Sequence, residues 1–189
     1  LAAGLLRAGV PAPWQLTAVG VGMAAWVVLG SRWMLPTAPD TEASAQKPHF
    51  AWPRGALLVI GLLIFAGMSA EGVMYDWCVL YLQQEVGMPQ AQAALGYAAF
   101  SGAMATMRFV ADGLRARFSE QRLLRASGTT TALAMAVVLL SGSPWVSLLG
   151  YACIGAGLAM VVPILYGAAS RVPGATPAAA IAAVSSIGY

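Results

Sequence analysis

Residues 55–82 read GALLVIGLLIFAGMSAEGVMYDWCVLYL, and the rest of the chain is organised around this stretch. The run is apolar apart from two carboxylates, Glu71 and Asp76. A helix rises about 1.5 Å per residue, so the stretch is long enough to cross a hydrocarbon core of about 30 Å with some tilt. It predicts a transmembrane helix, and the two acids are its candidate functional residues.

Glu71 has no charged residue before it in this stretch, which places it near the middle of the membrane. An unpaired ionised carboxylate at that depth costs at least about 2.5 kcal/mol, and acids in membrane spans commonly mark solute or ion pathways. Two interpretations stay open: Glu71 faces a water-filled cavity, where it exchanges protons or contacts solute, or it is a structural acid in a packed bundle. Asp76 carries the same two interpretations more weakly, because it lies near the far end of the span beside Tyr75 and Trp77, where interfacial aromatic residues are common.

The composition of the whole chain agrees with a membrane protein. Of its 189 residues, 59% are hydrophobic and 9% are charged, and the mean hydropathy is +0.74. A soluble domain usually carries about 25% charged residues. The formal net charge of +3 does not indicate a nucleic-acid partner, because the basic residues lie between hydrophobic stretches. The only histidine, His49, has no second ligand nearby, so we expect neither a metal site nor a cofactor.

Further apolar stretches extend the pattern to a polytopic bundle. Further spans are predicted at residues 14–35, 91–114, 126–142 and 144–169, with a last, shorter stretch from about residue 175. Pro163 is expected to kink its span, because proline has no backbone N–H to donate. Because the chain begins with Leu1 and its last apolar stretch is too short to cross, we expect it to be a piece of a longer protein.

The basic residues predict the orientation. All Lys and Arg residues except Arg7 fall on one side of the alternating connections. By the positive-inside rule, the polar loop at 36–54 is cytoplasmic and the turn at 83–90 lies outside. Counting residues from the inner end of each span puts Glu71 at a depth of about 22 Å and Arg108 at about 9 Å. We therefore expect these two residues not to pair directly.

A second constellation follows the 91–114 span. Arg108 and Asp112 are four residues apart, so they can share one helix face, and Arg115 and Arg117 follow at once. A carboxylate among several guanidiniums at a cytoplasmic helix end can form a salt-bridge cluster that changes partners when helices move, which predicts a gate. The alternative is a set of positive-inside anchors with one incidental acid, worth under about 1 kcal/mol if exposed.

The segment EGVMYDWCVLYL (71–82), followed by RFVADGLRARF (108–118), resembles the major facilitator superfamily, and within it the bacterial fucose-permease-related, sugar-permease-like branch. The family signature Gly-x-x-x-Asp-Arg-x-Gly-Arg-Arg is degenerate here: Asp112 matches its Asp and Arg117 its last Arg, whereas Arg108 replaces its first Gly. The resemblance implies an all-α, polytopic transmembrane helix bundle that is part of a twelve-helix fold. Residues 1–35 would end its N-terminal half, 36–54 would be the central cytoplasmic loop, and 55–189 would be a truncated C-terminal half.

The resemblance also implies alternating access around a site near mid-membrane. We therefore expect a secondary active transporter of the bacterial inner membrane that moves a small polar solute, coupled to protons through Glu71. Its partners would be the solute, protons, the lipid bilayer and the missing half of the same polypeptide. Trp77, Tyr97 and Tyr151 are candidates to line the solute site, although aromatic residues in spans also serve as packing or interface anchors.

Two alternatives from other classes are a non-transporting integral membrane subunit and a membrane enzyme. A structural subunit would need no acid in the middle of a span. An enzyme would show convergent nucleophiles, histidines or metal ligands at membrane depth, and the sequence places none there. We expect the protein not to be an enzyme.

Overall fold

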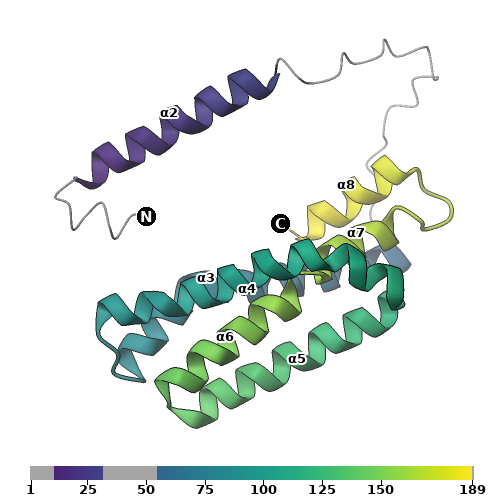
Figure 1. Ribbon diagram of the computed structural model, residues 1–189. Helices are drawn as coiled ribbons and strands as arrows, with labels where there is room; N and C mark the ends of the chain where they lie inside the picture. Colours follow the sequence, from purple (N-terminus) through teal and green to yellow (C-terminus); the bar gives the residue numbers. More distant parts are fainter. Residues whose placement is uncertain (1–10, 32–54, 189) are drawn as a thin grey trace. The chain divides into compact units, whose positions relative to one another are not determined.

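The computed structural model describes residues 11–31 and 55–188, and every element in these ranges is an α-helix (Figure 1). The chain divides into two units, and each is described by itself. The first contributes α2 (Ala12–Ser31), an apolar helix that covers most of the predicted span at 14–35. The predicted polar loop at 36–54 lies outside the described residues, so its cytoplasmic position stays a prediction.

The second unit is a bundle of six helices, and the all-α prediction is confirmed. Three segments are long and apolar enough to cross a membrane: α3, α5 and the combined run Pro144–Ala169. The bounds follow the predicted spans closely: α3 (Ala56–Gln84), α4 (Gln90–Arg117), α5 (Glu120–Ser141), α6 (Pro144–Leu158), α7 (Val161–Ala169) and α8 (Pro177–Gly188).

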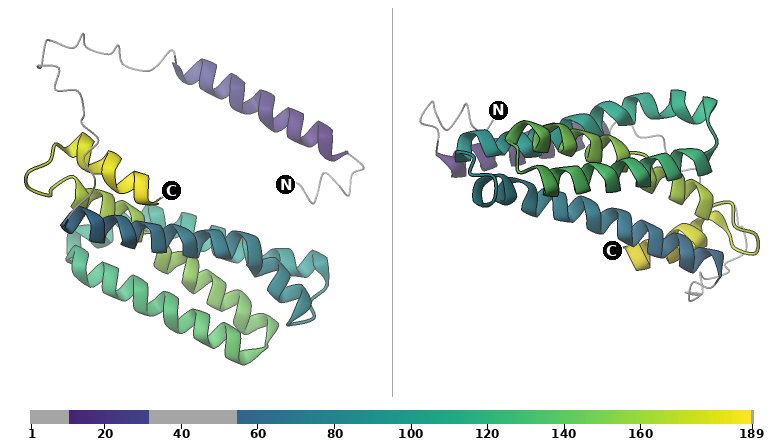
Figure 2. Two further views of the ribbon diagram at one scale, coloured as in Figure 1. Left: turned by 180° about the vertical axis from the view of Figure 1, so that it is seen from behind. Right: turned by 90° about the horizontal axis from the view of Figure 1, so that it is seen from below.

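Helix α6 occupies the centre of this bundle, packed between α4 and α5, whereas α3 lies beside α4 and α8 (Figures 1 and 2). Glycines allow the central helices to approach closely. A Cβ atom built on Gly155 would overlap the backbone carbonyl of Phe100 in α4, and one on Gly157 would come within 2.5 Å of the Thr131 hydroxyl oxygen in α5. Small residues have this use in membranes because no hydrophobic drive exists between helices surrounded by lipid.

The predicted kink in the 144–169 span is confirmed as a break between α6 and α7 at Ala159 and Met160. Pro163 explains its position, because a proline cannot donate to the carbonyl four residues earlier, which is that of Ala159. Both residues at the break are buried against neighbouring helices. A broken helix at membrane depth is tolerated where protein or a water-filled cavity surrounds the freed backbone groups.

Candidate functional site

Glu71 and Arg108 form an ion pair between α3 and α4, with 3.8 Å between a carboxylate oxygen and a guanidinium nitrogen. The expectation that these two residues would not pair was therefore wrong. Helix α4 continues to Arg117, which puts Arg108 about 14 Å from the helix end rather than about 9 Å. The side chains of Glu71 and Arg108 are long enough to span the remaining difference in depth, because the guanidinium of an arginine can lie far from its own Cα.

The two side chains of this ion pair differ in their exposure. The Glu71 side chain is 16% exposed, whereas that of Arg108 is 55% exposed. Charged side chains at mid-membrane depth face the bundle interior or a water-filled cavity rather than lipid, because lipid offers no partner for the charge. The guanidinium is therefore exposed on the surface of the described unit, whereas the carboxylate is mostly covered.

Polar residues continue from Arg108 along one face of α4. One face of α4 carries polar residues at intervals of three, four or seven residues, which is the spacing of one helix face: Tyr97, Ser101, Arg108, Asp112 and Arg115. The Ser101 hydroxyl is buried and has no hydrogen-bond partner among the described residues. We call this set the α4 polar face, and it runs from the N-terminal half of the helix to its C-terminal end.

Helix α3 adds an aromatic contact to this face one turn from Glu71. The Tyr75 ring lies 5.7 Å from the ring of Tyr97 and 5.4 Å from that of Phe100, the latter edge to face. Tyr97, one of the predicted lining residues, thus lies on the same side of the bundle as the ion pair. The two helices together bring an acid, a base and two phenols to one side of the bundle.

A cavity of about 230 Å³ adjoins the α4 polar face next to the break between α6 and α7. Arg108, Asp112 and Arg115 contribute its charged groups, whereas Ala159, Met160 and Pro163 on the opposite side contribute none. Three of the four residues predicted for the gate therefore line one cavity. Arg117, the fourth, is exposed near the end of α4 and makes no ion pair in the described part of the chain.

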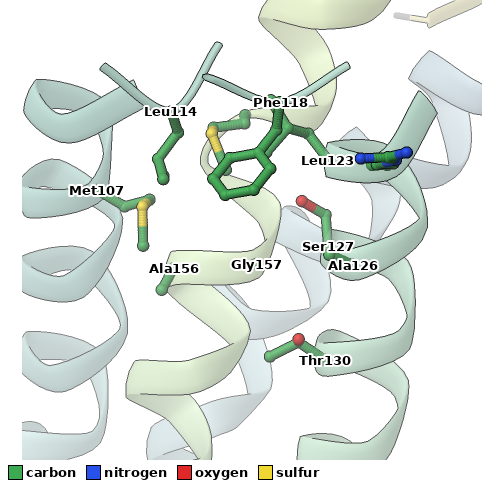
Figure 3. Close-up of a pocket in the computed structure, with 11 residues that line it drawn as sticks. Met107, Leu114, Phe118, Leu123, Ala126, Ser127, Thr130, Ala156 and Gly157 are labelled. Carbon is green, nitrogen blue, oxygen red and sulfur yellow. The ribbon is translucent and has the colours of Figure 1, made fainter. Parts of the chain in front are cut away.

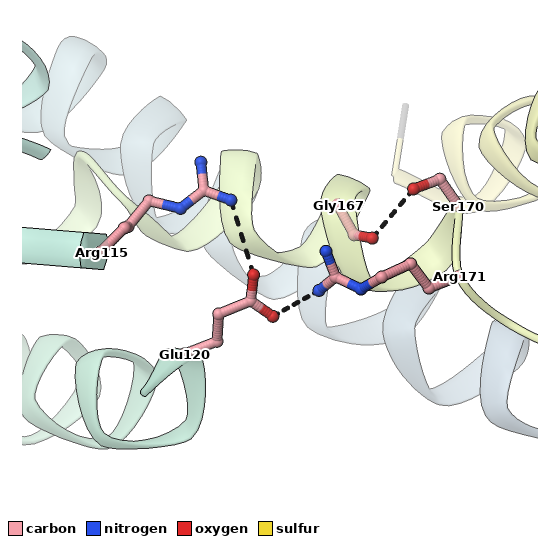
Figure 4. Close-up of polar contacts among 5 residues, drawn as sticks. All are labelled: Arg115, Glu120, Gly167, Ser170 and Arg171. Atoms are coloured by element: carbon pink, nitrogen blue, oxygen red, sulfur yellow. Dashed lines mark hydrogen bonds and ion pairs between the residues drawn. The ribbon is translucent and has the colours of Figure 1, made fainter. Parts of the chain in front are cut away.

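The acid that joins the ends of neighbouring helices is Glu120, which sequence reasoning missed. Its carboxylate accepts a hydrogen bond from Arg115 at 3.5 Å and a second, short one from Arg171 (Figure 4). Arg171 follows α7, so one acid joins the ends of α4, α5 and α7. The span was predicted to begin at residue 126, whereas α5 begins at Glu120. The available signal was an acid inside a basic run, and its partner 51 residues away left no local pattern.

Asp112 makes no ion pair among the described residues, although it lines the same cavity as Arg108. Asp76 is exposed and lies about 140° around α3 from Glu71, so the two acids do not share a face. The structure therefore separates the two candidate acids of α3 and leaves only Glu71 beside a base.

The other two predicted aromatic residues lie away from the ion pair. Tyr151 is 2% exposed, and its hydroxyl donates to the carbonyl of Cys78 at 3.5 Å. Trp77 is exposed beside an apolar cleft that also involves α5. In this conformation Tyr151 belongs to the core, and Trp77 to a surface away from the α4 polar face.

A second cavity, of about 340 Å³, lies between α4, α5 and α6 (Figure 3). Its lining is apolar except for Arg122, Ser127 and Thr130. It does not reach the Glu71–Arg108 pair and none of the predicted site residues lines it, so its size alone does not identify the functional site.

The described part of the chain has three helical segments long and apolar enough to cross a membrane, which indicates a multi-pass integral membrane protein. The family model of the Major Facilitator Superfamily matches residues 1–189. The chain therefore belongs to this superfamily, as its sequence predicted. Its place in the fucose-permease-related branch and the total of twelve helices stay predictions.

Three curated relatives are similar to the chain. An uncharacterized MFS-type transporter of Yersinia pestis is 32% identical over 142 residues, which are 75% of this chain and 37% of that protein. An uncharacterized transporter of Sinorhizobium fredii is 32% identical over 137 residues, or 72% of this chain and 36% of that protein. Membrane protein MosC of Rhizobium meliloti is 26% identical over 189 residues, or 99% of this chain and 46% of that protein.

The chain thus spans less than half the length of these relatives. No solved structure matches it. Family membership and the names of the first two relatives point to a transporter rather than an enzyme.

Proposed function

We propose that the full-length protein is a secondary transporter that moves a small polar solute across the membrane by alternating access. The observation that carries the proposal is the Glu71–Arg108 pair, which joins a largely covered acid on α3 to an exposed base on α4. Such a pair is costly in a bundle that only has to pack, and in membrane proteins it marks solute or ion pathways. The family of the chain and its transporter-named relatives support the same class.

Proton coupling through Glu71 is the second part of the proposal. The carboxylate is held by one long contact to Arg108 rather than by a network of donors. A proton that binds Glu71 removes this ion pair and loosens the connection between α3 and α4. Binding of a proton can therefore change which arrangement of the helices is favoured, as coupling requires.

The cytoplasmic gate is the third part. Glu120 holds α4, α5 and the end of α7 together through Arg115 and Arg171. In alternating access one side closes as the other opens, so contacts that join helix ends on the cytoplasmic side stabilise the closed arrangement there. Asp112, close to Arg115 along α4, is the acid available to accept a new bond when the helices move.

Transport by the full-length protein tests this function directly. Uptake of a panel of small solutes is measured in vesicles that contain the protein, with and without an inward proton gradient. We expect one solute to accumulate only when the gradient is present. If no solute accumulates in either direction, the proposal of a proton-coupled transporter is wrong, and a non-transporting membrane subunit becomes the better interpretation.

The gate predicts different effects for two acids. Glu120→Gln is expected to change the maximal transport rate several-fold with little change in KM, because it removes contacts between helix ends and leaves the mid-membrane pair intact. Asp112→Asn is expected to slow transport with solute affinity nearly unchanged. Initial rates over a range of solute concentrations separate rate from KM for each variant.

A matched control for the gate is Glu85→Gln, because Glu85 caps the outer end of α3. It should leave rate and KM unchanged. Normal rates in Glu120→Gln would show that the cluster is an anchor without a role in gating, and a normal rate in Asp112→Asn would do the same for Asp112.

A further inference from the structure

We propose that the transported solute is a small organic anion whose carboxylate binds Arg108 in the cavity beside the α6–α7 break. This inference rests on the proposed function and adds a substrate class to it. It begins with the guanidinium, which has several N–H donors arranged as a planar fork that fits a carboxylate. In the described residues its one ion pair is the 3.8 Å contact to Glu71, and more than half of the side chain is exposed.

The charges around the cavity favour an anion. Arg108 and Arg115 line it together with a single acid, Asp112. Arg115 is already bound by Glu120, so Arg108 is the base with open donors. The side formed by α6 and α7 adds no charge. A neutral sugar would leave the Arg108 charge without a second partner.

Size and depth narrow the ligand further. A cavity of about 230 Å³ is at the small end of ligand pockets, which usually measure about 300–1,000 Å³. Arg108 lies about 14 Å from the C-terminal end of α4, so it is inside the helix and not at its end. A free monocarboxylate fits both the volume and the position.

Sharing Arg108 between Glu71 and the solute explains how proton and anion would move together. The charged and titratable groups near the guanidinium are Glu71 and Tyr75 on α3 and Asp112 and Arg115 on α4. Ionised Glu71 attracts the guanidinium to which the solute carboxylate would bind. When Glu71 binds a proton, this attraction is lost and Arg108 pairs with the anion instead, so one proton and one negative charge enter together.

Equilibrium binding to the purified full-length protein tests the substrate class without any gradient. The probes are radiolabelled acetate, lactate and pyruvate as monocarboxylates, and glucose and fucose as neutral sugars. We expect a monocarboxylate to bind, more tightly at low pH than at high pH, and the sugars not to bind. Arg108→Gln should weaken this binding by at least about tenfold, as expected for the loss of a charge-assisted hydrogen bond.

Two variants and one control keep the result interpretable. Arg108→Lys retains the charge beside Glu71 and should bind the same probe with intermediate affinity, which covers the case in which Arg108→Gln does not fold. Glu71→Gln should bind it equally well at low and high pH. Arg122→Gln removes an equal charge from the apolar cavity and should bind as the wild type does.

The proposal is overturned if no monocarboxylate binds, if a neutral sugar binds instead, or if both Arg108 variants bind as the wild type does. Failure of proton coupling gives a different result. In that case the monocarboxylate still binds in a manner that depends on Arg108, but a proton gradient drives no accumulation. That outcome supports the anion site and contradicts the coupling.

Discussion

Glu71→Gln is expected to abolish accumulation of solute against its gradient in vesicles with an inward proton gradient, while solute still equilibrates across the membrane. The amide keeps the shape of the side chain but cannot bind or release a proton. It also cannot form the ion pair that holds Arg108 at 3.8 Å. The variant therefore stays in the equivalent of the protonated state, in which solute binds but the proton contributes no driving force.

The measurement is the accumulated ratio of solute with and without the gradient, together with exchange of labelled for unlabelled solute. Exchange should persist in Glu71→Gln, which shows that the protein is folded and binds its solute. Glu85→Gln, on the same helix but at its outer end, should accumulate solute normally. Normal accumulation by Glu71→Gln would make Glu71 a structural acid, the second interpretation that the sequence left open.

Gly155→Ala should destabilise the bundle by about 1–3 kcal/mol, the usual cost of forcing an extra group into a packed core. The new Cβ would overlap the carbonyl of Phe100, which is backbone and cannot rotate away as a flexible side chain can. Relief requires α4 and α6 to separate, and these helices form one of the closest contacts in the unit. Thermal unfolding of the full-length protein in detergent should show a lower midpoint and a lower yield.

Gly102→Ala is the matched control, because Gly102 is also inside α4 and a Cβ there meets no atom within 4 Å. Both changes remove the backbone freedom of a helical glycine, so this contribution is common to them. The control should be neutral or slightly stabilising. Equal stability of the two variants would contradict the close approach of α4 and α6.

Hydropathy was sufficient to predict the positions of the helices, because each apolar stretch is a local property of the chain. The central stretch at 55–82 became α3, and Pro163 predicted the break near Ala159, since the loss of one donor acts four residues away. Membership of the family also followed from patterns within the chain. These predictions needed no knowledge of which helix packs on which.

Pairing between helices could not be predicted in the same way. Depths counted along straight helix axes predicted that Glu71 and Arg108 lie too far apart to pair. The count did not include the true end of α4 or the length of an arginine side chain. The prediction of Asp112 as the acid of a gate rests on its closeness to the arginines in sequence. In the structure Glu120, and not Asp112, pairs with Arg115 and Arg171, because the end of α7 brings Arg171 to it.

The position of Arg108 also bears on how the chain enters the membrane. Helix α4 is long enough to cross, yet it is not among the three described segments that are apolar enough to do so by themselves. An arginine at mid-span costs about 2.5–3.5 kcal/mol on scales derived from insertion. Helix α3 is made first and carries Glu71, the counter-charge, into the bilayer. The order of synthesis thus supplies a partner before the more polar helix arrives, and we expect insertion of α4 to depend on α3.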